Sequence, residues 1–163
     1  MRTTPLTMVP TPTEVVRKLL ANTTNADVLN DLVTPDATYV SLNYSNPSLT
    51  RVLPYAGSHE KTGPQAIIDT FTTVNTIWAN EAFEVQALFG SGENVAVFGS
   101  FTYRSRTLGK ACTSPFSIWC KVNGQGKVTY MQFMEDTLGS TDTFKKEGVG
   151  KYIVFPEKGE FEL

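Results

Sequence analysis

The sequence predicts an α+β fold in which N-terminal helices precede a long antiparallel sheet. Apolar residues recur at helical spacing in two early segments and again over residues 63–78, whereas from residue 82 the apolar period changes to two. Turn sequences rich in glycine and asparagine separate the alternating segments. The 163 residues, 40% hydrophobic and 18% charged, suit one domain over 1–163, with a core at about 12–137 and a C-terminal extension over 138–163.

Capping residues and apolar stripes predict the helices. Thr11 and Glu14 form a capping-box pattern, so a first helix begins near residue 12. A second, short helix ends before Pro35, because the residue preceding a proline disfavours helix. Thr62 and Gln65 repeat the capping-box pattern at the start of the main helix. The apolar stripe of that helix consists of Ile67, Ile68, Phe71, Val74 and Trp78.

Alternating patterns predict the strands. Residues 37–44 alternate, with Tyr39, Ser41 and Asn43 on one face, and the proline-containing segment 45–61 is predicted to be a long irregular loop. Four strands then form an antiparallel meander, at about 83–89, 95–106, 112–122 and 127–137. The tail after residue 138 holds two short apolar pieces and is predicted to be a loosely packed extension or an arm that clasps a partner.

Composition argues against several classes of function. A formal net charge of −2 offers no basic stripe for nucleic acid. No apolar run approaches the roughly 20 residues of a membrane span, and residues 1–12 lack a signal-peptide pattern, so we expect no membrane association and a cytoplasmic location. Cys112 and Cys120 are expected to be reduced core residues. With one histidine and no glycine-rich phosphate loop, neither a metal nor an organic cofactor is expected.

Three stretches carry a family resemblance: LVTPDATY at 32–39, TGPQAI at 62–67 and FMEDT at 133–137. Together with the element order, they resemble the NTF2-like superfamily, and most closely its SnoaL-like branch of polyketide cyclases and ketosteroid isomerase-like proteins. The resemblance covers roughly residues 12–137. It implies a cone, in which a strongly bent antiparallel sheet wraps around the helices and encloses an apolar pocket. It also implies that the last strand sends a carboxylate toward that pocket.

Two adjacent carboxylates, Glu135 and Asp136, are candidates for that position. Strand alternation puts Glu135 on the face of Met131 and Phe133 and puts Asp136 on the opposite face, so only one of them can enter the pocket. Apolar surroundings would raise the pKa of such a carboxyl group and suit it to moving protons near neutral pH. The residues leave the choice open, and a solvated or ion-paired carboxylate at a strand end is the structural alternative.

His59, in the loop before the main helix, and Tyr39 are candidate acid–base partners of the carboxylate. A surface position or a loop-ordering hydrogen bond is the alternative for His59. Aromatic side chains could line the pocket, although each could equally belong to the core. These candidates are Trp78, Phe71, Phe101, Tyr103, Phe116, Trp119 and Phe133.

Three functions follow from this reading and remain open. The first is an isomerase, cyclase or dehydratase that moves protons on a small apolar carbonyl compound. The second is non-catalytic binding of such a molecule, and the third is a dimerising scaffold. The known catalytic sets of ketosteroid isomerase, limonene epoxide hydrolase and scytalone dehydratase are each incomplete here. A homodimer through the outer face of the meander is expected, because strands 95–103 and 112–122 carry apolar residues on both faces.

Overall fold

The computed structural model describes residues 9–163, so the expectation about a leader in residues 1–12 falls mostly outside it. The helices are α1 (Pro12–Leu20), α2 (Ala26–Leu32), α3 (Pro47–Val52), α4 (Pro64–Ile77) and α5 (Thr137–Asp142), with a 3-10 turn at Pro156–Lys158. The strands are β1 (Val33–Ser41), β2 (Gly57–His59), β3 (Trp78–Ser91), β4 (Asn94–Ser105), β5 (Ala111–Val122), β6 (Val128–Glu135), β7 (Lys151–Tyr152) and β8 (Phe161–Glu162).

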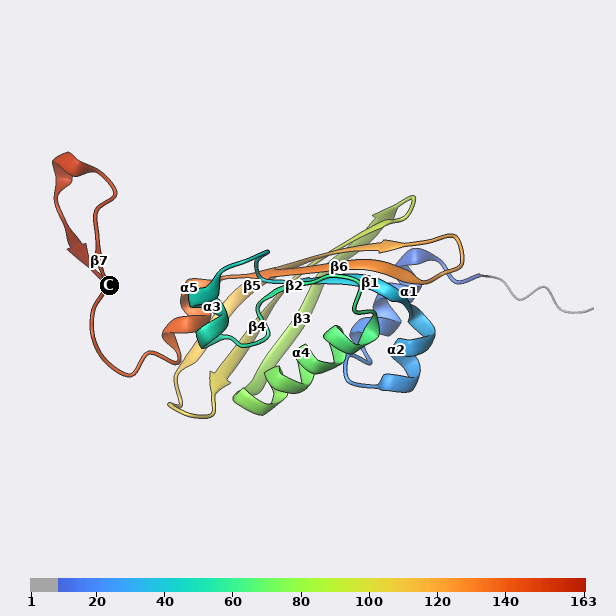
Figure 1. Cartoon of the computed structure of the whole chain (residues 1–163), viewed down its shortest axis with the longest axis horizontal. Coiled ribbons are helices and arrows are strands. Elements are labelled where there is room, and N and C mark those ends of the chain that lie inside the picture. Colours follow the sequence, from blue (N-terminus) through green and yellow to red (C-terminus); the bar gives the residue numbers. More distant parts are fainter. Residues whose placement is uncertain (1–8) are drawn as a thin grey trace, which may run out of the picture.

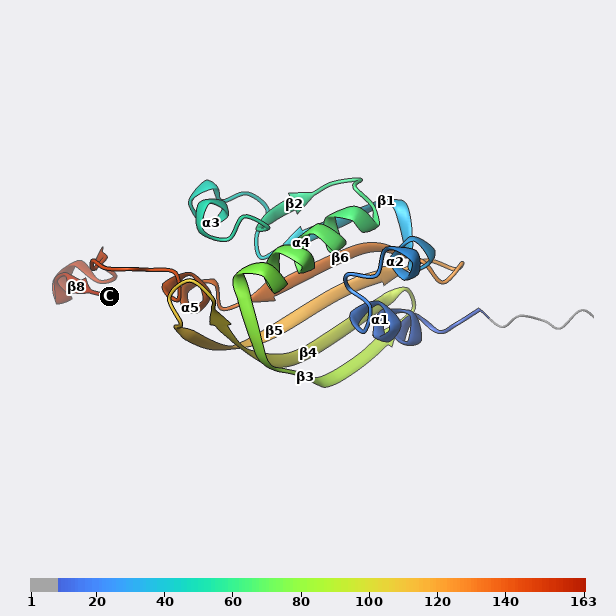
Figure 2. The same cartoon turned by 90° about the horizontal axis from the view of Figure 1, so that it is seen from below.

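Six strands form one curved sheet in the order β2-β1-β6-β5-β4-β3. Strands β3 to β6 make the antiparallel meander that the alternating pattern predicted. The sheet is antiparallel, as expected, except at one strand pair, because β1 pairs in parallel with β6. After β1 the chain passes through α3, β2 and α4 before it enters the meander. The last strand of the meander, β6, then runs beside β1 in the same direction. Figure 2 shows α1, α2 and α4 together over one face of this sheet.

Irregular pairing in β3 contributes to the bend of the sheet. The register between β3 and β4 shifts twice, between Asn80 and Ala82 and between Val85 and Ala87, and extra residues of this kind bend and twist a strand. Gly99 of β4 lies opposite the second irregularity. A Cβ atom there would sit 2.1 Å from the carbonyl oxygen of Glu84 and 2.5 Å from the Phe116 ring, so the close approach of the two strands requires glycine.

The core fills the space between the helices and the inner, concave face of the sheet. Strands β4, β5 and β6 turn alternate apolar residues inward, as their period of two predicted, and the helices contribute their apolar stripes. Strand β3 departs from the predicted alternation, because Val85 and Phe89 are exposed. Core residues that are almost completely buried include Val16, Leu19, Leu29, Ile67, Val95, Val97, Ile118 and Met131.

Local capping explains where α1 begins, whereas the cap predicted for α4 was wrong. The capping box at α1 is confirmed, since the Glu14 amide donates to Thr11 Oγ1 and the Thr11 amide donates to Glu14 Oε2. At α4 the cap residue is Gly63, with φ of 64° and no side-chain bond, while the Thr62 hydroxyl donates to the carbonyl of His59. Glycine is needed there because a Cβ would lie 2.5 Å from the Pro35 carbonyl oxygen.

The segment 45–61 departs from the predicted irregular loop. It contains α3, which Asn46 caps by accepting from the Leu49 amide, and β2, which pairs with β1. The preceding strand also differs from the prediction, because β1 begins at Val33 and ends at Ser41, and Leu42 then takes a left-handed φ of 66°.

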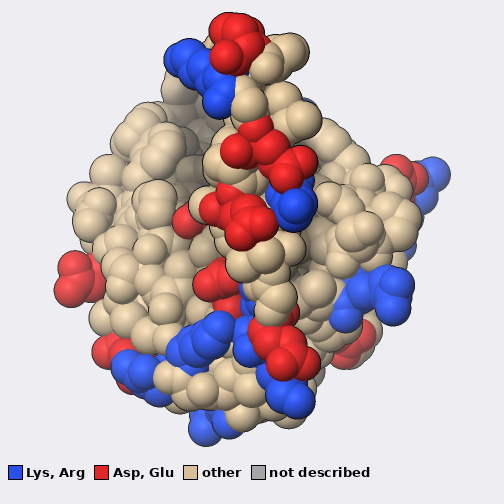
Figure 3. All heavy atoms as spheres, turned by 90° about the vertical axis from the view of Figure 1, so that its left-hand side faces the viewer, with Lys and Arg blue, Asp and Glu red and all other residues tan. Residues whose placement is uncertain are grey.

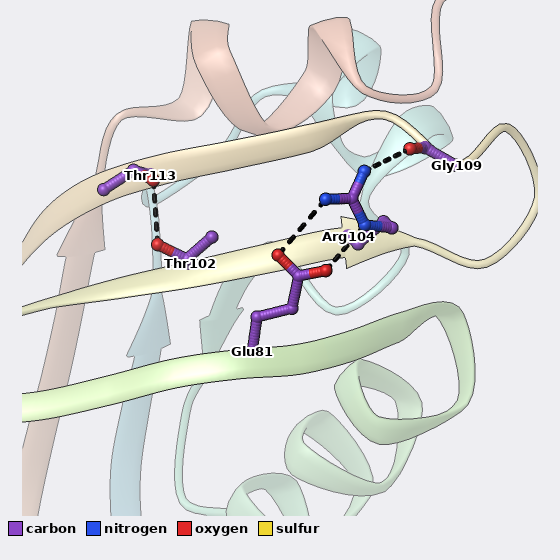
Figure 4. A network of polar contacts seen from close by, with 5 residues as sticks. All are labelled: Glu81, Thr102, Arg104, Gly109 and Thr113. Carbon is purple, nitrogen blue, oxygen red and sulfur yellow. Dashed lines mark hydrogen bonds and ion pairs between the residues drawn. The ribbon is translucent and has the colours of Figure 1, made fainter.

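The outer face of the sheet carries a polar network at one end. Arg104 donates through Nε to Glu81 Oε1 at 2.6 Å and through a second nitrogen to the carbonyl of Gly109 at 2.7 Å (Figure 4). Nearby, the hydroxyl oxygens of Thr102 and Thr113 are hydrogen-bonded to each other at 2.8 Å. Elsewhere on this face, large side chains remain exposed: Phe89, Phe98, Trp119 and Met134. This face therefore mixes a polar end with an apolar area.

The C-terminal extension forms a separate hairpin of β7 and β8 that projects from the body of the molecule (Figure 1). Its apolar side chains, including Ile153, Val154 and Phe155, are exposed. Acidic and basic side chains are both present on this end of the molecule (Figure 3). Over residues 9–163, no helix combines the length and the apolar character that crossing a membrane requires.

Candidate active site

A narrow cavity lies between α4 and the inner face of the sheet. Its volume is about 20 Å³, which is room for roughly one water molecule. The walls come from β1, β4, β6, α4 and the segment around α3. The lining residues are Tyr39, Ser41, Leu42, Tyr55, Thr70, Phe71, Val74, Tyr103, Phe133 and Glu135. An apolar cavity with a few converging polar groups is the usual form of a small-molecule site, although this one is much smaller than usual.

Glu135 is the carboxylate of this cavity. It ends β6 on the same face as Met131 and Phe133, because side chains in a strand alternate. Burial raises its pKa from 4.5 to about 7, a hydrogen bond from Ser140 opposes that rise, and the nearby Asp136 charge adds to it. The Ser140 hydroxyl donates to Glu135 Oε1 at 2.8 Å, so the carboxyl group is held in one orientation. A carboxyl group with this pKa can both accept and donate a proton near neutral pH.

Asp136 lies outside the cavity, where it has a structural role. It is the N-cap of α5: its Oδ1 accepts from the Gly139 amide at 3.0 Å, and its side chain is exposed. Its own amide donates to Ser114 Oγ. Of the two candidate carboxylates, the structure therefore places only Glu135 against the cavity.

Three tyrosines share the cavity with Glu135. Burial raises the pKa of Tyr39, Tyr55 and Tyr103, that of Tyr103 to about 12, and the negative charge of Glu135 raises each of them further. All three hydroxyls are therefore neutral at physiological pH. Neutral hydroxyls can donate hydrogen bonds to a carbonyl oxygen, and they stabilise it most when negative charge develops on it.

Comparison with known proteins gives the chain its family. No family model matches it. Patulin synthesis protein F of Aspergillus clavatus is 42% identical over 151 residues, which cover 91% of this chain and 76% of that protein. The chain belongs to the patulin synthesis protein F family. Patulin biosynthesis cluster protein F of Penicillium expansum is 41% identical over 152 residues, with the same coverage.

Solved structures of other proteins share the fold of this chain. An NTF2-like protein of Burkholderia thailandensis superposes with a TM-score of 0.68 at 20% identity, over 83% of this chain and 98% of that one. TerC, co-crystallised with polyporic acid, gives a TM-score of 0.63 at 20% identity, over 82% and 98% of the two chains. IdmH, a candidate polyketide cyclase of Streptomyces antibioticus, gives 0.61 at 11% identity, over 83% and 99%. The fold is the NTF2-like cone that the sequence resemblance implied.

His59 lies beside the cavity but does not form part of its wall. Its ring stacks on that of Tyr39, with centroids 6.1 Å apart, and its Nε2 lies 3.1 Å from the carbonyl oxygen of Tyr55. The ring faces a separate surface hollow, formed by residues 44–59. His59 therefore orders the segment that carries Tyr55, and it does not meet Glu135 in this cavity.

The other aromatic candidates divide between the wall, the layer behind it and the opposite face. Phe71 and Phe133 line the cavity with Tyr103. Behind them, Phe116 stacks on Phe133 at 5.5 Å, Phe101 stacks on Tyr103 at 4.3 Å, and the Trp78 indole nitrogen donates to the hydroxyl of Tyr55. Trp119 cannot line this cavity, because it points from the outer face of β5 and bonds Asn94 there.

Sequence reasoning missed four polar residues of the site: Ser41, Tyr55, Thr70 and Ser140. The alternation of residues 37–44 put Ser41 on the face of Tyr39, so the signal for Ser41 was present. Thr70 lies on the buried stripe of α4, three residues after Ile67 and four before Val74. Tyr55 and Ser140 had no local signal, because only tertiary folding brings them to β6. Among residues 9–163, no cluster of three or more His, Cys, Asp or Glu side chains could hold a metal ion.

Proposed function

We propose that this protein is a cofactor-independent acid–base catalyst that acts on a small carbonyl compound in the synthesis of a small organic product. The observation that carries the proposal is the buried carboxyl group of Glu135, held by Ser140 and facing three neutral tyrosines. The names of the two relatives place those proteins in patulin synthesis, which supports a role in the assembly of a small molecule here.

The proposed reaction begins when the Glu135 carboxylate removes a proton from the carbon next to the substrate carbonyl. The electron pair of that C–H bond forms a carbon–carbon double bond, and the carbonyl π electrons move to oxygen. Hydroxyls of Tyr39, Tyr55 or Tyr103 donate hydrogen bonds to that oxygen, whose negative charge they stabilise. Glu135, now protonated, returns the proton to another carbon in an isomerisation or to a leaving hydroxyl in a dehydration.

The remaining features of the proposal concern the assembly of the protein and its location. The exposed apolar area of the outer face, formed by Phe89, Phe98, Trp119 and Met134, supports a homodimer across this face. We place the dimer in the cytoplasm. A non-catalytic ligand-binding protein is the alternative, but a desolvated carboxyl group is costly for a site that binds only apolar molecules.

Exchange of protons for deuterium tests this proposal. In deuterated buffer, wild-type protein should accelerate loss of the α-proton NMR signals of small cyclic enones such as cyclohex-2-enone. Glu135→Gln should reduce the acceleration by on the order of a hundredfold or more, since glutamine cannot accept the proton. The matched control is Asp136→Asn, which removes the adjacent carboxylate from outside the cavity and should retain wild-type exchange.

A second measurement needs no substrate. In carbon-13 NMR the Glu135 carboxyl group should titrate near pH 7. A Glu135 pKa close to 4.5, or equal exchange by wild-type protein and Glu135→Gln, would overturn the acid–base function. Binding of the enones without any exchange would favour the ligand-binding alternative.

A further inference from the structure

The cavity beside Glu135 is too small for an organic substrate. Its volume of about 20 Å³ holds one water molecule, whereas sites for small organic ligands usually measure roughly 300–1,000 Å³. Part of the wall must therefore move before a carbonyl compound can reach Glu135.

Most of the wall is held in regular structure. Tyr39, Tyr103 and Phe133 belong to strands paired within the sheet, and Phe71 and Val74 belong to α4, which is packed on the core. Among the lining residues, only Leu42 and Tyr55 lie outside these elements. Both belong to the segment that connects β1 to β2.

The part of this connection that follows Leu42, residues 43–56, is called the segment below and has its own internal hydrogen bonds. Asn46 caps α3, and the Thr50 hydroxyl donates to the carbonyl of Ala56 at 2.9 Å. Helix α3 contains no fully buried residue. The segment meets the core through Leu49 of α3, which is partly buried, and through Leu53, Tyr55 and Ala56, which follow α3 and are buried. Opening of the segment must therefore withdraw these side chains from the core and break the hydrogen bond from the Ser58 amide to the Tyr44 carbonyl, while the paired strands that carry the rest of the wall stay in place.

Unusual backbone conformations lie at both ends of the segment. Leu42 has φ of 66°, and among residues 9–163 only Leu42 and Lys61 combine a non-glycine side chain with positive φ. Gly57 has φ of 142° at the other end, with open space where a Cβ atom would lie. Glycine rotates easily, and the left-handed Leu42 is strained, so these two residues suit the role of hinges.

Two side chains have opposite effects on the closed form of the segment. The side-chain amide of Asn43 is buried, and neither its oxygen nor its nitrogen has a hydrogen-bond partner among residues 9–163, which disfavours the closed form. The hydroxyl of Tyr55 accepts a long hydrogen bond of 3.4 Å from the Trp78 indole, which favours it. Tyr55 thus supplies one of the contacts that hold the segment closed and is also a hydroxyl of the site.

We propose that residues 43–56 form a flap that opens about Leu42 and Gly57 to admit the substrate and, on closing, brings the Tyr55 hydroxyl against it. The motion of the flap is independent of the reaction, whereas the substrate contact of Tyr55 rests on the proposed acid–base function. Tyr55 becomes a substrate-binding residue that is in place only in the closed form. Closure also removes water from around Glu135, which strengthens the hydrogen bonds made there.

Hydrogen exchange of backbone amides tests the motion. The amides of Thr50, Leu53 and Ala56 are hydrogen-bonded within the flap, and we expect their protection to be at least about a hundredfold lower than that of the paired amides of β4 and β5. Equal protection of the flap and of these strands would show that the flap opens only when the whole protein unfolds, and would overturn the proposal.

Two substitutions should shift flap opening in opposite directions. Tyr55→Phe removes the bond to Trp78 and should lower protection of the flap amides about fivefold, whereas Asn43→Leu removes the unpaired amide and should raise it about tenfold. Thr34→Val is the matched control, because the Thr34 hydroxyl is likewise buried without a partner but lies in β1. It should leave flap protection relative to β4 unchanged. Equal effects of Asn43→Leu and Thr34→Val on that ratio would count against a local flap.

The contact between Tyr55 and substrate has its own readout. If wild-type protein exchanges the α-protons of cyclohex-2-enone, Tyr55→Phe should lower kcat for that exchange about tenfold or more, as loss of an oxyanion donor does. An unchanged kcat would remove Tyr55 from the site and leave the flap in place. Failure of the acid–base function itself would instead be seen as equal activity of wild-type protein and Glu135→Gln, with the amide-exchange results unaffected.

Discussion

Replacing Glu135 with glutamine should change the way in which the stability of the protein depends on pH. The carboxyl group is buried, so its pKa is about 7 in the folded protein against 4.5 for the free side chain. Glutamine has nearly the same shape, carries no charge, and can still accept the hydrogen bond that Ser140 donates. The substitution therefore isolates the effect of ionising one buried carboxyl group.

The sign and the size of this change in the free energy of unfolding follow from proton linkage. Between pH 4.5 and 7 the folded state keeps the proton that the unfolded state has lost, so the free energy of unfolding falls as pH rises through this range. At about 1.4 kcal/mol per pH unit, the interval corresponds to about 3 kcal/mol. Below pH 4.5 Glu135 is protonated in both the folded and the unfolded state, and the burial of its carboxyl group then causes no loss of stability. Above pH 7 this loss is fully present, so Glu135→Gln should then be more stable than wild type by up to about 3 kcal/mol.

Urea unfolding from pH 4.5 to 8 provides the assay, with the difference between variant and wild type as the quantity of interest. Contributions from the other ionisable groups cancel in that difference. Asp136→Asn is the control and should give a difference that varies much less with pH, because asparagine caps helices about as well as aspartate and the Asp136 charge is the smallest of the named contributions to the Glu135 pKa. A flat difference for Glu135→Gln would refute the argument, since it would mean that the carboxyl group ionises equally easily in both states.

The remaining predictions concern the sheet and the assembly. Gly99→Ala should lower the free energy of unfolding by about 2–3 kcal/mol or more, because the added Cβ would approach the Glu84 carbonyl oxygen to 2.1 Å; an unchanged urea midpoint would contradict the close strand approach. Phe98→Glu puts a charge in the exposed apolar area of the outer face and should convert a dimer to a monomer. Light scattering of wild-type protein at micromolar concentration would decide against the dimer if it gave 17.9 kDa.

Local patterns predicted much of the fold because its elements depend on nearby residues. The capping box of α1 involves residues three apart, and the strands of the meander follow from alternation along each segment. The predictions were wrong where a contact with a residue distant in the sequence determines the local structure. Gly63 begins α4 because the carbonyl of Pro35 leaves no room for a side chain, and β2 exists because residues 57–59 pair with β1. Neither partner can be identified from the local sequence.

The adjacent carboxylates show the same division within the candidate site. Alternation established that only one of Glu135 and Asp136 could face inward, but the choice depends on how β6 is placed. Phe116 of β5 pairs with Glu135 and points into the core, so Glu135 points inward too. Asp136 then falls where the strand ends and α5 begins, and it caps that helix. The fourth residue of α5, Ser140, returns to bond the Glu135 carboxylate. The helix that holds Asp136 outside the cavity is therefore the same element that orients Glu135 within it. The stretch FMEDT at 133–137 could not distinguish the two residues, because the choice depends on the pairing of β6 with β5, and the orientation of Glu135 depends on a serine beyond that stretch.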